Sequence, residues 1–341
     1  MFDHLIGNQA AKEAITRFIT AGRVPNSLLF AGTDGVGKKQ FALQLAKSIV
    51  CLQAGHGKAC GICAACARVG GFKFPGPDAK GEDYDRVFFS DHLDVGMVVP
   101  FNRTLRVGSI RALEVEANFR PYEAKARVFI IDEAQRMNAA ASNALLKTLE
   151  EPPSSSHIFL ITSKPNALLP TIRSRVQTLR FGPVSGEQIE HLLLTTHQYS
   201  QEDAHLVAFG SNGSVSRAAS AKVDDFREVR DLALEILRDA IVHRDLVGVL
   251  RLSEKVTAQR TTPEYEIFLD ILQGLIHQLW SICIGQSNAH GDDEIAKLAS
   301  SADASKLVSW LDHIEQIRAA LLVNVNKKIV TDDLVVKMAA G

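Results

Sequence analysis

Four of the five cysteines in this sequence lie close together, and their type and spacing are typical of a metal site. Cys51, Cys60, Cys63 and Cys66 are separated by eight, two and two residues, whereas Cys283 lies far downstream. This spacing allows four thiolates to surround one tetrahedral zinc ion, which leaves no coordination position open for catalysis. The odd number of cysteines argues against a disulfide framework, and a redox-active CxxC pair or inert buried thiols are the alternatives. We therefore expect one structural zinc ion, held by the four clustered cysteines.

A second group of residues follows a short apolar run and has the spacing of a phosphate-binding loop. The sequence GTDGVGK matches the pattern G-x4-G-K, and its signature residues are Gly32, Gly35, Gly37 and Lys38. Glycines let the backbone curl so that its N–H groups and the start of the following helix surround phosphate oxygens. Lys38 is placed to reach the β- and γ-phosphates of a nucleotide. A glycine turn that binds no ligand is the alternative.

The residue after Lys38 departs from the phosphate-loop pattern. Ser or Thr is expected there, because its hydroxyl is a ligand of Mg²⁺, but the sequence has Lys39. An ammonium group has no lone pair with which to coordinate a cation. We therefore expect that ATP can bind, that Mg²⁺ is not well held, and that ATP hydrolysis by this chain is weak or absent.

A later apolar run ends in two acidic residues. Residues 128–131 read VFII, and Asp132 and Glu133 follow directly. This pattern is typical of a buried central strand that delivers carboxylates at its carboxyl end, where α/β proteins form their sites. In P-loop ATPases the first acid helps to hold Mg²⁺ and a neighbouring polar group positions water. Asp132 is therefore the predicted metal-side acid and Glu133 the water-positioning residue, with an ordinary strand end as the alternative.

These residues need a parallel sheet to bring them together, and the pattern of the first 180 residues predicts one. Short apolar runs alternate there with segments of helical period, as in an α/β domain. The candidate strands are residues 27–31, 86–90, 127–132, 157–162 and 176–181. From residue 225 onward there are amphipathic helical stretches without strand signals, which predicts an all-α region.

Composition excludes several classes of protein. The chain has 341 residues, 38 Lys and Arg against 39 Asp and Glu, and 46% hydrophobic residues, as in ordinary globular proteins. It has no run approaching the roughly 18 apolar residues of a membrane helix, and its early Asp3 is not typical of a signal peptide. A pI near 6.8 argues against DNA binding driven by overall charge. We expect a cytoplasmic protein of two or three domains that does not contact a membrane.

Three further segments resemble a known family. Residues 143–153 read NALLKTLEEPP, residues 159–163 read FLITS, and residues 169–176 read LPTIRSRV. Together they resemble the AAA+ subunits of bacterial DNA polymerase III clamp loaders. The opening FDHLIGNQ and the position of the cysteine module after the phosphate-loop helix are similar to that family as well. The resemblance covers about the first 220 residues.

The resemblance implies a domain organisation and a set of partners. It implies an AAA+ P-loop domain with a zinc module (51–66) over residues 1–182, a small helical lid over 183–223, and a helical collar over 224–341. In the family the collar joins five subunits into a ring. The implied partners are therefore the gamma/tau and delta subunits, with the sliding clamp and primer-template DNA reached through the complex.

The resemblance also implies roles for single residues. The segment SRV stands where the family has Ser-Arg-Cys, which implies that Arg175 acts as a finger on ATP held by the adjacent subunit. A solvated surface arginine is the alternative. Ser163, or Thr162, matches the polar sensor at the end of a sheet strand. Arg217 matches an arginine of the lid that contacts nucleotide, although its register is shifted.

Two functions from different classes are compatible with this resemblance. In the first, the chain is a scaffold subunit that hydrolyses little or no ATP and supplies Arg175 to a neighbour. In the second, it is an ATP-hydrolysing motor (gamma/tau-like) subunit with a working site of its own. Lys39 and the spacing of GSVSRA around Arg217 favour the first. A zinc-containing nucleic-acid reader is a weaker third hypothesis, because the cysteine loop lacks interleaved aromatic residues and dense Lys and Arg.

Overall fold

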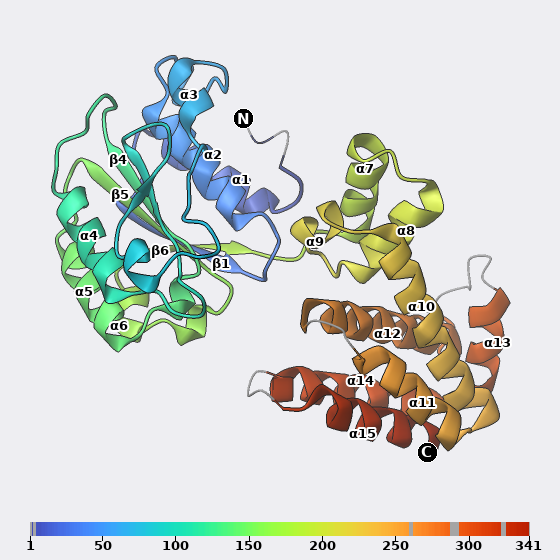
Figure 1. Cartoon of the computed structure of the whole chain (residues 1–341). Helices are drawn as coiled ribbons and strands as arrows, with labels where there is room; N and C mark the ends of the chain where they lie inside the picture. Colours follow the sequence, from blue (N-terminus) through green and yellow to red (C-terminus); the bar gives the residue numbers. More distant parts are fainter. Residues whose placement is uncertain (1, 3–4, 259–261, 287–292, 322–324, 341) are drawn as a thin grey trace. The chain divides into compact units, whose positions relative to one another are not determined.

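The computed structural model describes residues 2, 5–258, 262–286, 293–321 and 325–340. The chain forms two compact units (Figure 1). The first consists of Met1–Gln188 with Gly213–Ser216, and the second of Ile189–Asn212 with Arg217–Gly341. The finer division into an AAA+ domain, a lid and a collar remains a prediction.

One sheet forms the centre of the first unit. Its strands are β1 (Ser27–Gly32), β2 (Phe88–Phe89), β3 (Val95–Val98), β4 (Arg127–Ile131), β5 (Ser156–Thr162) and β6 (Gln177–Phe181). They lie in the order β2-β3-β4-β5-β1-β6, and every neighbouring pair is parallel except β2 and β3 at the edge. This confirms the predicted α/β fold. The predicted strands do not include β3, because its four residues contain Gly96 and show no alternation of apolar and polar side chains.

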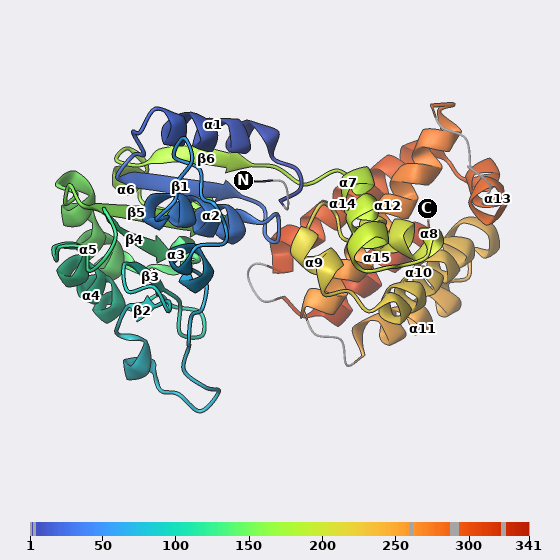
Figure 2. The same cartoon turned by 90° about the horizontal axis from the view of Figure 1, so that it is seen from above.

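Side chains alternate along β1 and enter two separate cores. Leu28 and Phe30 pack with helices on one face of the sheet, whereas Leu29 and Ala31 pack with helices on the other. The first face is covered by α1 (Gln9–Thr20) and α2 (Lys38–Val50), and the second by α4 (Val107–Ala117), α5 (Ala139–Glu150) and α6 (Pro170–Arg173). Figures 1 and 2 show α4 and α5 across the strands from α1. Because both faces are covered, the central strands contain continuous apolar runs, such as residues 128–131 of β4 and 158–161 of β5.

Short helical turns and a buried charge complete the first unit. The turns are η1 (Gly81–Tyr84), η2 (Ala134–Arg136) and η3 (Pro165–Ala167). Arg127, at the start of β4, is fully buried and lies 3.7 Å from the carboxylate of the equally buried Asp94. Its guanidinium donates to the carbonyl oxygen of Glu116 at 2.6 Å. Asp94 in turn accepts hydrogen bonds from the backbone N–H groups of residues 122, 123 and 124, so it holds the loop before β4 in place.

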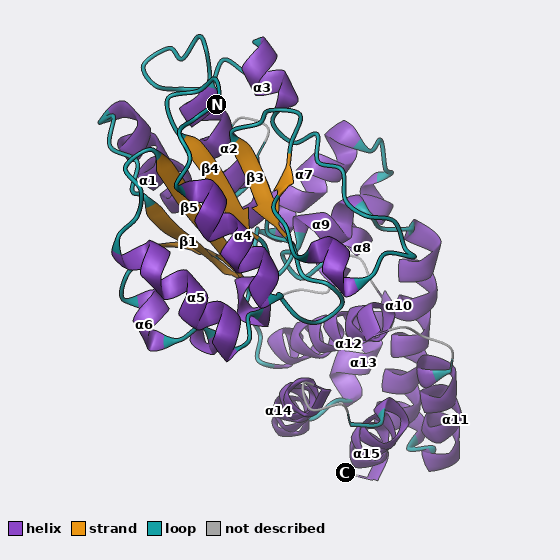
Figure 3. Cartoon of the chain, turned by 60° about the vertical axis from the view of Figure 1, so that its left-hand side comes forward, coloured by secondary structure: helices purple, strands orange, loops and turns teal. Residues whose placement is uncertain are grey.

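The second unit is helical throughout its described residues (Figure 3). Its helices are α8 (Gln201–Gly210), α10 (Val223–Arg238), the π-helical turn η4 (Asp239–His243), α11 (Leu246–Thr257), α12 (Thr262–Cys283), α13 (Asp293–Ser301), α14 (Ala304–Leu321) and α15 (Lys327–Ala340). Two further helices, α7 (Gly186–Thr196) and α9 (Val215–Ala219), begin in residues of the first unit. This confirms the predicted all-α region. Among the described residues, no helix combines the length and the hydropathy needed to span a membrane.

The buried pair of Asp94 and Arg127 leads to a stability prediction. We expect Asp94→Ala to lower the free energy of unfolding of the first unit by about 3–5 kcal/mol. It removes one of the two carboxylates beside the buried guanidinium of Arg127, the other being that of Glu116, and it leaves the N–H groups of residues 122–124 without their acceptor. Chemical denaturation followed by circular dichroism measures the effect. Lys147→Ala, which removes an exposed ion pair with Glu114, is the control and should cost less than about 1 kcal/mol. Equal losses in both variants would contradict the prediction.

Candidate nucleotide and metal sites

The four clustered cysteines converge at one point beyond the end of α2. Their Sγ atoms all lie within 4.8 Å of one another. The distance is 3.6 Å between Cys51 and Cys60 and 3.9 Å between Cys51 and Cys63. Four sulfur ligands around a tetrahedral zinc ion, with bonds of about 2.3 Å, lie about 3.8 Å apart. The cluster can therefore hold one metal ion, and its all-thiolate donor set suits zinc.

Local backbone structure explains why the thiols converge. Cys51 follows the last residue of α2, and Cys63 caps the start of the short helix α3 (Ala64–Arg68). Backbone N–H groups of three cysteines point at the thiol of the cysteine before them, at 3.3–3.5 Å. Hydrogen bonds from the N–H groups of Cys66 and Leu52 lower the pKa of the Cys63 thiol to about 6. Burial raises the pKa of Cys66 to about 12, so metal binding must displace a proton there.

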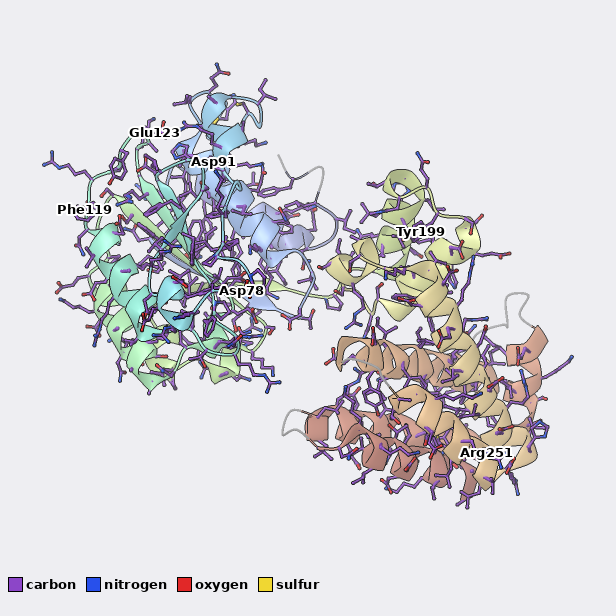
Figure 4. All side chains as sticks on the ribbon, in the orientation of Figure 1. Asp78, Asp91, Phe119, Glu123, Tyr199 and Arg251 are labelled. Atoms are coloured by element: carbon purple, nitrogen blue, oxygen red, sulfur yellow. The ribbon has the colours of Figure 1, made fainter. Side chains whose placement is uncertain are left out.

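A surface ion pair attaches the cysteine module to the loop before β4. Arg68, the last residue of α3, donates two hydrogen bonds of 2.8 Å to the carboxylate of Glu123, which is labelled in Figure 4. The backbone N–H of Glu123 in turn binds the buried Asp94. The module is therefore connected to the first unit both through α2 and through this loop.

The phosphate loop joins β1 to α2, and its lysine is turned inward. Lys38 is only 6% exposed. Its ammonium donates to the carbonyl oxygens of Gly32 at 2.7 Å and Thr33 at 2.6 Å. Asp34 lies 3.8 Å away, and burial lowers the pKa of Lys38. The loop thus supplies hydrogen-bond acceptors for its own lysine.

Residues 213–216 contact the phosphate loop at Gly35. The N–H of Ser216 donates to the carbonyl oxygen of Gly35 at 2.9 Å. A Cβ atom at Gly35 would lie 1.9 Å from the hydroxyl of Ser214. The φ angles of Gly35 and Gly37 are +76° and +94°, values that L side chains rarely adopt. These two glycines are therefore required by backbone conformation, and Gly35 also by close packing.

The two residues expected to decide metal binding contact each other. The Nζ atom of Lys39 lies 3.0 Å from Oδ2 of Asp132, which directly follows β4. The other oxygen of Asp132 accepts the backbone N–H of Glu133 at 3.1 Å. The structure therefore brings Asp132 to the phosphate loop, as the parallel sheet predicts, but the partner of its carboxylate is an ammonium group.

Polar residues after β4 and at the end of β5 form a connected group. Oε2 of Glu133 lies 2.6 Å from Nε of Arg136, and burial raises the pKa of Glu133. The side chain of Gln135 accepts a hydrogen bond from Thr162 at 2.8 Å and donates one to Ser163 at 3.4 Å. Glu133, Gln135 and Ser163 line one pocket of about 410 Å³. The roles of Glu133 and Ser163 toward a nucleotide remain predictions.

Arg175 lies just after α6, at the surface of the first unit. Its side chain is 35% exposed, and its guanidinium lies 2.7 Å from the carboxylate of Glu150, the last residue of α5. It also donates to the carbonyl oxygen of Thr171 at 3.0 Å. These contacts orient the guanidinium while part of it stays accessible.

Arg217 lies in the second unit and binds a buried carboxylate there. It donates to Oδ2 of Asp270 in α12, whose side chain is 3% exposed. Arg318 of α14 donates to the other oxygen of Asp270 at 2.7 Å. Two guanidinium groups thus offset the burial of one carboxylate. The guanidinium of Arg217 thus has its carboxylate partner within the helical unit. A role for Arg217 in nucleotide binding remains a prediction.

Three contacts of these sites involve residues that the sequence analysis does not single out. Gln135 follows the acidic pair within the turn η2, so attention to polar residues just after the strand would find it. Glu150 is one of two consecutive acids at the end of α5, and its ion pair with Arg175 depends on how α5 and α6 pack. Phe74, whose ring lies 5.8 Å from Nζ of Lys39, stands in a Gly- and Pro-rich segment that carries no signal for this contact.

The fold and the sites together define a class of protein. A largely parallel sheet, a phosphate loop between β1 and α2, and an acidic pair after β4 are the features of a P-loop protein of the AAA+ class, here joined to a helical unit. The model of the family described as "DNA polymerase III, delta subunit" matches residues 7–185, which is just over half of the chain. The chain therefore belongs to this family of clamp-loader proteins.

Named relatives are consistent with this family. The DNA polymerase III subunit delta' of Bacillus subtilis (strain 168) is 33% identical over 218 residues, which cover 64% of this chain and 60% of that protein. The DNA polymerase III subunit tau of Escherichia coli (strain K12) is 27% identical over 319 residues, which cover 86% of this chain and 46% of that protein. The chain thus spans between 46% and 60% of the length of these two relatives.

A solved structure extends over a larger share of the chain. A DNA polymerase III gamma subunit-related protein of Thermotoga maritima is 18% identical, and the match covers 96% of this chain and 98% of that one. Its TM-score is 0.40, which is too low for a comparison of details.

The cysteine cluster leads to a prediction about metal content. We expect the full chain, purified without chelator, to contain about one zinc ion per molecule by elemental analysis. Cys63→Ser should lower the zinc content and increase hydrogen exchange over residues 51–66, while the P-loop domain stays folded, because the module is an insertion after α2. Cys283→Ser in the second unit is the control and should keep its zinc. A wild-type chain without zinc would show that the prediction is wrong.

The phosphate loop leads to a prediction about ATP hydrolysis. We expect the isolated chain to release phosphate far more slowly than ordinary ATPases, whose turnover is on the order of 1–10³ per second. The reason is that Lys39 provides no hydroxyl ligand for Mg²⁺. A phosphate-release assay with and without primed DNA measures this rate. Turnover of about a few per second would contradict the prediction.

Proposed function

We propose that this chain is the delta-prime subunit of the DNA polymerase III clamp loader. In this role it is a scaffold of the five-subunit ring that loads the sliding clamp onto primed DNA. Its partners are the gamma/tau and delta subunits, and it reaches the clamp and primer-template DNA through the complex. The observation that carries this proposal is the ion pair between Lys39 and Asp132, because a motor subunit needs the aspartate for Mg²⁺.

Arg175 is the residue through which such a subunit acts on a neighbour. Phosphoryl transfer spreads negative charge over the γ-phosphate oxygens, and an arginine supplied by another subunit stabilises that charge in the transition state. The guanidinium of Arg175 is accessible and is oriented by Glu150 and the carbonyl oxygen of Thr171. A planar guanidinium offers two parallel donors to phosphate oxygens, which an ammonium group does not. An idle phosphate site is compatible with this role, since the ATP in question is held by the next subunit.

The alternative is an ATP-hydrolysing motor subunit of the same loader. The likeness to the tau subunit of Escherichia coli over 319 residues favours it. The contacts of the phosphate loop favour the delta-prime assignment, because Lys38 binds the loop's own carbonyl oxygens and Lys39 binds the acid expected to hold the metal. Zinc in the cysteine cluster has a structural role in either case.

The proposed function predicts opposite outcomes for two substitutions in the assembled loader. Arg175→Ala should leave zinc content and ring assembly intact and lower the ATPase and clamp-loading rates of the reconstituted complex. Arginine fingers contribute on the order of 10³-fold or more at a single site, and here the loss is confined to one site of several. Lys38→Ala should change these rates little. Steady-state ATPase and clamp-loading assays on the reconstituted complex measure both effects.

Two control variants test the specificity of the Arg175 effect. Arg175→Lys should not restore activity, because a point ammonium does not reproduce the bidentate geometry. Arg173→Ala removes a neighbouring exposed arginine that hydrogen-bonds only Asn166 among the described contacts, and it should be silent. If Lys38→Ala abolishes the activity of the complex and Arg175→Ala is silent, the chain is the motor subunit instead.

A further inference from the structure

Lys39 occupies the place at the phosphate loop where a P-loop ATPase holds its metal ion. The residue at this position of α2 normally supplies the hydroxyl ligand, and the acid after β4 supplies the second protein contact. In this chain the Nζ atom of Lys39 lies 3.0 Å from Oδ2 of Asp132. The Lys39 side chain is 41% exposed and that of Asp132 is 19% exposed, so this ion pair is partly shielded from water.

An aromatic side chain lies near this ammonium group as well. The ring of Phe74 lies 5.8 Å from Nζ of Lys39, within the range of a cation–π interaction. Phe74 is itself held by a stacked contact with Phe72 and an edge contact with Phe88 of β2. Asp132 and Phe74 thus give the Lys39 ammonium an anionic and an aromatic neighbour, which together stabilise its position.

The residues present do not fit Mg²⁺. The ion takes oxygen ligands at about 2.0–2.1 Å in near-octahedral geometry. Lys39 offers no oxygen, and its positive charge lies at hydrogen-bond distance from the carboxylate on which the metal would depend. An ion placed on Asp132 would therefore be repelled by the ammonium group and would lack the hydroxyl ligand as well.

We propose that the ammonium group of Lys39 replaces Mg²⁺ at this site, so that nucleotide binding there does not depend on the metal. The ligand class is a nucleoside diphosphate or triphosphate in its metal-free form, bound by the loop N–H groups and by Lys38 and Lys39. The proposal rests on the assignment of the chain as a subunit with an idle ATPase site. An ammonium carries one positive charge where the metal carries two, so affinity for the anion is modest and does not increase when Mg²⁺ is added.

The test compares ADP binding in EDTA and in excess Mg²⁺, by isothermal titration of the full-length chain. For the wild type, Mg²⁺ should leave the affinity for ADP unchanged or weaken it. For Lys39→Thr, which restores the hydroxyl ligand and frees Asp132, Mg²⁺ should strengthen binding by about tenfold or more, equivalent to about 1.4 kcal/mol. Lys39→Met removes the charge without adding a hydroxyl, and it should bind ADP more weakly than the wild type in EDTA and gain nothing from Mg²⁺.

Several outcomes would overturn the proposal. One is a wild type whose affinity for ADP rises with Mg²⁺ as much as that of Lys39→Thr, and another is a wild type that binds no ADP in EDTA. A third is a Lys39→Thr chain that is folded by circular dichroism and gains nothing from Mg²⁺. Lys39→Ser serves as the second hydroxyl variant if the threonine chain does not fold. The measurement uses no other loader subunit and no hydrolysis, so its outcome is separate from that of the Arg175 experiment.

Discussion

The parallel alignment of β1, β5 and β4 is the constraint on which the nucleotide site depends. β5 lies between the other two strands and pairs with both, so all three carboxyl ends meet at the same edge of the sheet. The phosphate loop follows β1, Asp132 follows β4, and Ser163 follows β5. A shift of one residue in either pairing would turn the side chains of a strand to the opposite face, and the two apolar cores prevent such a shift.

Three basic residues at positions predicted to lie near a nucleotide have carboxylate partners within this chain. Lys39 binds Asp132, Arg217 binds Asp270, and Arg175 binds Glu150. The three pairs differ in burial, and the free-energy cost of separating a pair increases with its burial. Exposed ion pairs contribute about 0–1 kcal/mol, whereas removing one partner of a buried pair costs about 3–5 kcal/mol. Arg175 is therefore the most readily redirected to another molecule, and Arg217 the least.

The cysteine module lies at the ends of α2 and β4 that are distant from the nucleotide site. It extends from the C-terminal end of α2, and Arg68 connects it to Glu123 in the loop before β4. That loop is fixed by Asp94, whose partner Arg127 begins the strand that leads to Asp132. The helix that carries the phosphate loop and the strand that carries the acid are thus both anchored at the ends distant from the site.

Local patterns in the sequence were sufficient to predict much of this protein. The phosphate loop and the acidic pair after an apolar strand depend on residues adjacent in sequence, and the cysteine module depends on close spacing. The all-α character of the later region follows from helical periodicity in the same way. In contrast, the short strand β3 has too few residues for a periodic signal, and it forms because β2 and β4 pair with it.

Only the tertiary structure decided the partner of each charged side chain. The sequence shows that Lys39 lacks the hydroxyl ligand, but Asp132 is 93 positions away and Phe74 belongs to a segment without regular pattern. The contacts of Arg217 with Asp270 and of Arg127 with Asp94 likewise join distant positions. Such pairs depend on how helices and strands pack, because a long side chain binds whichever opposite charge the fold brings within a few ångströms. Residue types at neighbouring positions therefore determined which chemistry was available to this protein, and packing between distant elements determined which of those groups are free to perform it.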